Sequence, residues 1–114
     1  MKYLMNIKDE YIEAIKTGIK KREYRLAKPE RLKINIGDII RLVSDNDENY
    51  YIDVKVIGIS NFKDWNDALK KHWEEDFKCL YDNFNGVIIE CKKYYKEEDI
   101  QKYGIIVFDI IFNR

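Results

Sequence analysis

The chain has 114 residues, 37% of them charged, and its 21 Lys and Arg residues balance 21 Asp and Glu residues. This length predicts a single domain over residues 1–114. The zero net charge argues against a non-specific nucleic-acid coat protein, which would be strongly basic. No apolar run approaches the roughly 20 residues that span a bilayer, and no secretory segment is recognisable. We therefore expect a cytoplasmic location, no membrane partner and, from the frequent Ile, Lys, Asn and Tyr residues, a bacterial source with an AT-rich genome.

The elements can be predicted in chain order from hydrophobic spacing and turn residues. We expect strands over residues 3–7, 38–44, 51–59 and 105–112, with the middle two forming a hairpin. We expect helices over residues 8–18, 64–77 and 96–104. Residues 27–35 are predicted to form a loop, and residues 85–95 suit either a helix or a strand.

A glycine and a capping residue support the boundaries of the first two predicted helices. Ile12, Ile15 and Ile19 recur at helical spacing, and Gly18 is a typical C-terminal stop. Asp64 is a candidate N-cap for the helix that follows it. Strands dominate the middle and the end of the chain, with helices inserted between them. The fold class is therefore α+β, a small mixed β-barrel with flanking helices at its openings.

The few cysteine and histidine residues limit the metal sites that the chain can form. Cys79 and Cys91 lack CxxC spacing, and His72 is the only histidine. A structural zinc site needs about four ligands, so we predict no metal and no cofactor. Without an adjacent basic partner, both thiols are expected to pack as small apolar side chains.

Charge is concentrated in the segment GIKKREYRL, residues 18–26. Between Lys16 and Lys33 there are eight Lys or Arg residues and two Glu residues. In an extended segment, Lys21, Glu23 and Arg25 share one face. Glu23 is then either a salt-bridge partner on a solvated face, or the group that orients the guanidinium of Arg25 toward a phosphate or a base edge.

Other side chains give weaker signals. The acidic cluster Glu74, Glu75 and Asp76 suits a solvated turn or a general acid or base. His72 has no second histidine and no nearby nucleophile. The nine tyrosines could stack nucleobases, although most are expected at the edge of the core.

The chain resembles the ASCH domain family through several motifs that occur in the family's order. The family pattern is Gly-x-Lys-x-x-Glu-x-Arg, then an Ile-x-x-Gly-Asp turn, then a late Tyr-rich helix that runs into Tyr-Gly and a strand. The matching positions span nearly the whole chain, and they are Gly18, Lys20, Glu23, Arg25, Ile34, Gly37, Asp38, Tyr94, Tyr95, Tyr103 and Gly104.

The resemblance implies a PUA-like β-barrel with a cleft between the first helix, the next strand and the barrel mouth. The family is associated with RNA and nucleoside recognition, and ribonuclease activity has been attributed to members. Some bacterial members are amidohydrolases that deacetylate N4-acetylcytidine with a lysine, a threonine and a glutamate. Lys20 matches that lysine, Glu23 stands at the position of the threonine, and the glutamate falls at Glu74 or Glu75.

Three functions remain open from the sequence. The first is RNA or nucleotide binding in a basic cleft, with the ligand contacted by Lys20, Lys21, Glu23, Arg25, Lys28 and Arg31. The second is an amidohydrolase that acts on an N4-acetylcytidine-like nucleoside, with Lys20 as base and Glu23 positioning it or activating water. The third is a protein-interaction module that uses a tyrosine-rich surface.

Overall fold

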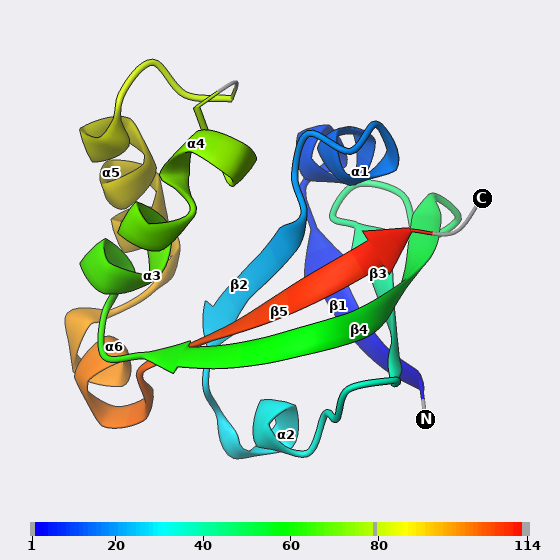
Figure 1. Ribbon diagram of the computed structural model, residues 1–114, viewed down its shortest axis with the longest axis horizontal. Coiled ribbons are helices and arrows are strands. Elements are labelled where there is room, and N and C mark those ends of the chain that lie inside the picture. Colours follow the sequence, from blue (N-terminus) through cyan, green and yellow to red (C-terminus); the bar gives the residue numbers. More distant parts are fainter. Residues whose placement is uncertain (1, 79, 113–114) are drawn as a thin grey trace.

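The structure is a computed structural model that describes residues 2–78 and 80–112, in which one curled sheet is accompanied by six helices (Figure 1). The strands are β1 (Lys2–Ile7), β2 (Arg22–Leu26), β3 (Ile39–Ser44), β4 (Tyr51–Phe62) and β5 (Ile105–Phe112). The helices are α1 (Asp9–Lys16), α2 (Pro29–Leu32), α3 (Trp65–Lys71), α4 (Trp73–Asp76), α5 (Phe84–Tyr94) and α6 (Glu97–Tyr103). Cys79, one of the two predicted packing thiols, lies outside the described residues.

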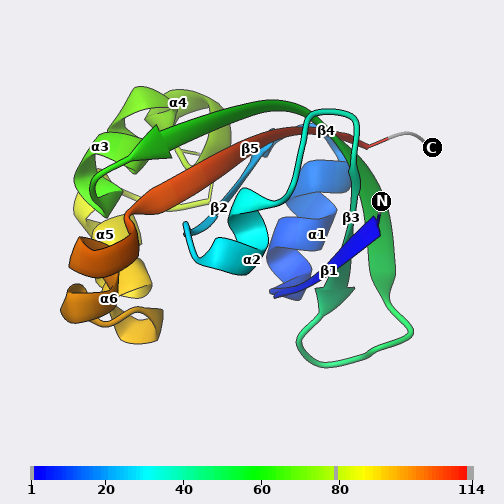
Figure 2. The same cartoon turned by 90° about the horizontal axis from the view of Figure 1, so that it is seen from below.

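The five strands form one mixed sheet in the order β1-β3-β4-β5-β2. β1 runs parallel to β3, and the other neighbouring pairs are antiparallel, including the predicted β3–β4 hairpin. β1 and β2 stand at opposite edges and do not pair with each other, so the barrel is open. The curled sheet forms a half-barrel (Figure 1). Figure 2 shows α1 and α2 under the curve of the sheet, with α3 to α6 gathered beyond one end of β4 and β5. The predicted α+β class, with a barrel-like mixed sheet and flanking helices, is confirmed.

β5 separates two hydrophobic clusters because successive side chains of a strand point to opposite faces. Ile106 and Phe108 belong to the cluster between the sheet, α1 and the hairpin. Ile105 and Val107 belong to the cluster that holds α3, α5 and α6 against β2. All four side chains are at most 2% exposed. The apolar run Ile105–Phe108 of β5 therefore contributes to two cores, and the site described below lies between them.

Two expected elements differ in the structure. The segment predicted as a loop contains the single turn α2, which begins at Pro29, where the fixed φ of proline favours the first helical position. The helix expected over residues 64–77 is broken at His72, whose φ of −123° leaves the helical region. The break redirects the chain so that Asp76 is buried against β2. Residues 85–95, left open between helix and strand, lie mostly in α5.

The predicted capping signals are present. The side chain of Asp64 accepts a hydrogen bond of 2.9 Å from the backbone N–H of Asp67, as an N-cap does. Gly18 follows α1 with a φ of +83°, a conformation that glycine adopts without strain. Ile19, expected on the apolar face of that helix, lies beyond it and is 41% exposed. Among the residues described, no helix is both long and apolar enough to cross a membrane.

Candidate functional site

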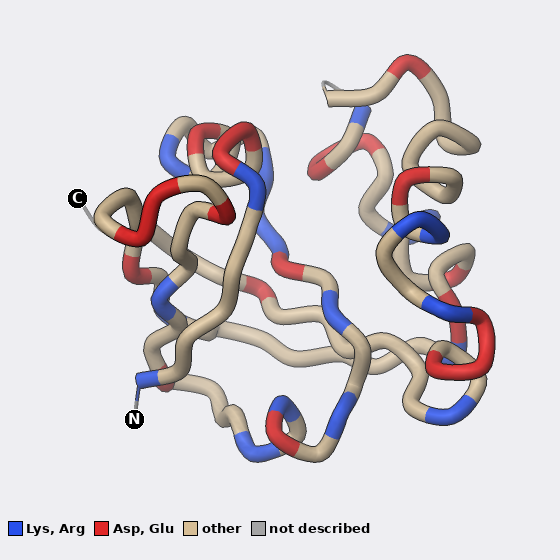
Figure 3. Tube along the Cα trace, turned by 180° about the vertical axis from the view of Figure 1, so that it is seen from behind, with Lys and Arg blue, Asp and Glu red and all other residues tan. Residues whose placement is uncertain are grey.

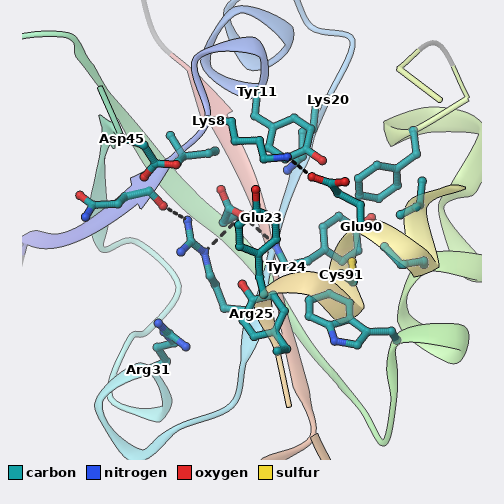
Figure 4. Close-up of a pocket in the computed structure, with 18 residues that line it drawn as sticks. Lys8, Tyr11, Lys20, Glu23, Tyr24, Arg25, Arg31, Asp45, Glu90 and Cys91 are labelled. Atoms are coloured by element: carbon teal, nitrogen blue, oxygen red, sulfur yellow. Dashed lines mark hydrogen bonds and ion pairs between the residues drawn. The ribbon is translucent and has the colours of Figure 1, made fainter. Parts of the chain in front are cut away.

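A cavity of about 340 Å³ lies between the half-barrel and the group of helices α3 to α6 (Figure 4). β2 forms its floor, the end of β1 and the start of α1 form one wall, and α3 and α5 form the other. Aromatic rings of Tyr11, Tyr24, Trp65, Tyr94 and Tyr95 line it. The site therefore combines apolar walls with a few converging polar groups, as ligand pockets commonly do.

Lys20 reaches this cavity from the segment between α1 and β2. Its backbone N–H donates to the carbonyl of Ala14 over 3.0 Å, which folds the chain back after α1. The side chain is 2% exposed, and its Nζ donates to the carbonyl of Arg22. The rings of Tyr24 and Phe77 surround the amine at 5.3 and 5.8 Å. Lys20 is thus a cation enclosed by aromatic faces.

Burial lowers the pKa of Lys20 below its ordinary value, because the charged amine loses water. The carboxylates of Glu23 and Asp76 oppose that shift, and the charge of Arg25 adds to it. A lysine with a lowered pKa has a larger free-amine fraction at neutral pH than a surface lysine. Such an amine can act as a proton acceptor.

Glu23 is the buried acid of the pocket, with 5% exposure. Its Oε1 accepts a hydrogen bond of 3.1 Å from the N–H of Tyr24 and lies 3.4 Å from Nε of Arg25. Within the described residues its Oε2 has no hydrogen-bond partner. A buried carboxylate oxygen without a donor is costly, so this atom marks a place where a ligand N–H or O–H can bind.

Two arginines line the same pocket, together with the carboxylates of Glu23 and Asp45. Arg25 comes from β2 and donates to the carbonyl of Asn6, whereas Arg31 comes from α2 and donates to the carbonyl of Leu26 over 3.0 Å. Burial and then the charge of Arg25 lower the pKa of Arg31. In the part of the chain that the structure describes, no carboxylate lies within ion-pair distance of Arg31. The guanidinium groups therefore retain donors that can bind an oxyanion.

The sequence-predicted residues separate into two sets. Lys20, Glu23, Arg25 and Arg31 line the pocket, whereas Lys21 and Lys28 do not. The side chain of Lys21 is exposed, and Lys28 precedes α2 as its N-cap residue. Of the three residues expected to share one face, Glu23 and Arg25 line the pocket, whereas Lys21, just before β2, does not. Figure 3 shows the basic positions recurring along β2 and around α2.

Asp76 is the buried acid of α4, and it does not line the pocket. It is fully buried, whereas the side chains of Glu74 and Glu75 are 79% and 50% exposed and neither lines the pocket. Asp76 accepts hydrogen bonds from the backbone N–H of Lys21 over 2.7 Å, from Nη1 of Arg22 over 3.3 Å and from the hydroxyl of Tyr24. In the sequence, Asp76 is the last of three adjacent acidic residues, and no local pattern distinguishes it from Glu74 and Glu75.

Lys8 and Glu90 are pocket residues that sequence reasoning missed. They form an ion pair between the N-cap position of α1 and the middle of α5. Tyr11 and Tyr81 form a second contact between hydroxyl groups across the same gap. Cys91 also lines the pocket, and burial raises the pKa of its thiol to about 12, so the thiol is protonated at neutral pH.

Across residues 2–78 and 80–112, no three His, Cys, Asp or Glu side chains gather as a metal site requires.

The fold is thus a small α+β half-barrel with a pocket on β2. The model of the ASCH domain family matches residues 5–111, so the chain belongs to that family. Comparison with curated protein sequences gives no match.

Solved structures agree with this assignment. The crystal structure of hypothetical protein PH0355 has a TM-score of 0.84 and 32% identity, over 99% of this chain and 100% of that one. The NMR structure of protein PF0455 from Pyrococcus furiosus has a TM-score of 0.75 and 26% identity, over 98% and 97% of the two chains. The ASCH protein from Zymomonas mobilis has a TM-score of 0.66 and 16% identity, over 96% of this chain and 66% of that one, a likeness of fold.

Proposed function

We propose that the protein binds RNA or a nucleotide by taking one nucleobase into the pocket on β2. The observation that carries this proposal is the convergence of Lys20, Glu23 and Arg25 on one cavity of about 340 Å³. Pockets that hold small molecules measure roughly 300–1,000 Å³, and unstacked bases commonly lie against aromatic side chains. If these three side chains had pointed apart on a convex surface, they would instead indicate a solvent-exposed charged face without a binding role.

Each polar group has a role in this proposal. Oε2 of Glu23 accepts from an N–H on the edge of the base, which supplies the donor that this buried atom lacks. Arg25 and Arg31 bind a phosphate where their guanidinium groups line the pocket. Lys21 and Lys28 contact phosphates outside the pocket, where they add affinity without reading the base. An RNA ligand fits the cytoplasmic location expected from the sequence.

Fluorescence anisotropy with labelled single-stranded RNA oligonucleotides tests this proposal. Binding should weaken as salt rises, with a slope of about −0.7 per phosphate contact on a single strand. Arg31→Met should reduce affinity and flatten the slope by about one contact. If no oligonucleotide binds at low salt, the proposal fails.

A second candidate, hydrolysis of an N4-acylated cytidine, is favoured by the lowered pKa of Lys20 beside Glu23. In that reaction Lys20, as the free amine, accepts a proton from the water that adds to the acyl carbon. Lys20 then returns this proton to the leaving nitrogen as the C–N bond breaks, which gives a carboxylic acid, ionised at neutral pH, and the free amino group. Chromatography of N4-acetylcytidine incubated with the protein would detect cytidine. The reaction is excluded if turnover does not exceed that of Lys20→Ala.

A further inference from the structure

Two side-chain contacts span the space between α1 and the helical group beside the pocket. One is the ion pair between Lys8 and Glu90, and the other joins the hydroxyl groups of Tyr11 and Tyr81. Figure 4 shows Lys8 and Glu90 pointing toward one another at one edge of the pocket. Neither Lys8 nor Glu90 belongs to either hydrophobic cluster. The ion pair can therefore break while both cores stay packed.

A second, smaller cavity of about 150 Å³ lies on the other side of this contact. It shares Lys8, Tyr11 and Glu90 with the pocket and is otherwise lined by Glu10, Leu80 and Tyr81. Residues that line both cavities stand between them. When Lys8 and Glu90 separate, the partition opens on their side, while Tyr11 and its contact with Tyr81 remain.

The contact between Lys8 and Glu90 is held by charge, and Nζ of Lys8 also lies 5.0 Å from the ring centroid of Tyr94. Its two side chains are 28% and 24% exposed, and each has a second partner of opposite charge. Lys8 lies 3.9 Å from Glu10, and Glu90 lies 3.5 Å from Lys93. Partly exposed ion pairs contribute little net stability, and both side chains keep a partner after separation. Opening of this contact is therefore a local event of small free-energy cost.

We propose that Lys8 and Glu90 form a gate between the two cavities and thereby set the size of the ligand that the pocket accepts. With the gate closed, the pocket takes a single base-sized group. With the gate open, a hydroxylated group such as a ribose can enter the second cavity, where the carboxylates of Glu10 and Glu90 accept hydrogen bonds. The size limit rests on the proposed nucleobase binding, whereas the motion of the gate does not.

Cys91 provides a probe of the gate that needs no ligand, because it lines the pocket and is one of the two cysteines. In a Cys79→Ser background, the rate of its modification by the neutral reagent N-ethylmaleimide reports access to the pocket. The variants are Lys8→Met and Glu90→Met, each of which removes the ion pair and introduces the same side chain. Thermal unfolding of each variant establishes that it is folded.

The two variants have opposite electrostatic effects on the probe, since Glu90 raises the pKa of Cys91 and Lys8 lowers it. A gate predicts that both variants react faster by about fivefold, the factor that corresponds to losing a partly exposed ion pair. Faster reaction of Glu90→Met with slower reaction of Lys8→Met would mean an electrostatic effect alone and would overturn the gate. Equal rates in all three proteins would overturn it as well. The control Lys93→Met removes only the outer partner of Glu90 and should react at the rate of the background protein.

The size limit is tested with the same proteins and the free base cytosine against the nucleoside cytidine. Both gate variants should raise the nucleoside-to-base affinity ratio by about fivefold. An unchanged ratio overturns the size limit while the labelling result stands. If no variant binds either compound, the proposed function is overturned, and the size limit with it. The motion of the gate is still decided by the labelling rates.

Discussion

Glu23 and Arg25 form an ion pair on the edge strand β2, with Nε of Arg25 3.4 Å from Oε1 of Glu23. The contact lies within ion-pair distance but lacks hydrogen-bond geometry, and Nε of Arg25 is a buried donor without a partner among the described residues. Both side chains also line the pocket. Within the described part of the chain, two residues that line the cavity therefore hold a buried unpaired acceptor, Oε2 of Glu23, and a buried unpaired donor, Nε of Arg25. A ligand that reaches them with both kinds of group would satisfy both atoms.

Glu23→Gln should weaken RNA binding by about 10- to 100-fold, the range for a lost hydrogen bond to a charged group. The amide keeps the shape of the side chain but removes the charge that accepts from the base and orients Arg25. Anisotropy titration measures the affinity, and Glu74→Gln serves as a matched control because its side chain is 79% exposed and lies outside the pocket. Equal affinities of the two variants would exclude a role for Glu23 in binding.

Lys20 should titrate below the ordinary lysine value of 10.5, because burial disfavours the charged amine. The ¹³Cε resonance of Lys20, assigned by its loss in Lys20→Met, measures this pKa directly. Between the lowered pKa and 10.5 the unfolded chain holds a proton that the native chain has lost. The free energy of unfolding of the native sequence relative to Lys20→Met should therefore rise with pH through that interval. A Lys20 resonance that titrates with the surface lysines would contradict this prediction.

Asp76→Asn should lower the free energy of unfolding by about 1.5–3 kcal/mol, the range for hydrogen bonds to charged groups. The carboxylate is fully buried and accepts from Lys21, Arg22 and Tyr24, so an amide leaves at least one donor poorly paired. Glu75→Gln is the neighbouring control. Its side chain is 50% exposed and lies 3.7 Å from Arg22, so the expected cost in chemical denaturation is below about 1 kcal/mol. Similar losses for both variants would mean that Asp76 has no special role.

Gly104→Ala should destabilise the protein by about 1–3 kcal/mol, because its backbone is in a region that favours glycine. Its φ is +72°, and an added Cβ would lie 2.9 Å from the carbonyl oxygen of Phe62. Gly86→Ala, within α5, has room for a Cβ and should instead stabilise the protein by about 0.5–1 kcal/mol. Thermal or urea unfolding of the pair gives the signs, and loss of stability in Gly86→Ala alone would contradict this local geometry.

Elements with a strong local signal could be predicted from the sequence. Gly18 ends α1 and Asp64 caps α3, because each acts through its own backbone or a residue three positions away. The ion pair of Glu23 with Arg25 could likewise be anticipated from their spacing on one strand. The break at His72 could not, since it depends on the burial of Asp76 against a strand more than fifty residues earlier.

The far wall of the pocket could not be predicted for a similar reason. Glu90 meets Lys8 only because the sheet and α5 fold against each other, and neither residue stands in a distinctive sequence pattern. Lys21 was placed on the pocket face by alternation. In the structure the side chain of Lys21 is exposed and does not line the pocket, and its backbone N–H donates to Asp76. Tertiary contacts thus determine which members of a charged segment reach the site.

The indole resonance of Trp65 in ¹H–¹⁵N NMR spectra tests nucleobase binding in the pocket most directly. Trp65 lines the pocket with a buried Nε1 that has no hydrogen-bond partner among the described residues, whereas Trp73 does not line it. On titration with a single-stranded RNA oligonucleotide, the Trp65 resonance should shift to saturation while that of Trp73 stays close to its free position. RNA binding that moves the backbone amides of Lys21 and Lys28 but leaves the Trp65 indole unchanged would contradict the pocket as the binding site.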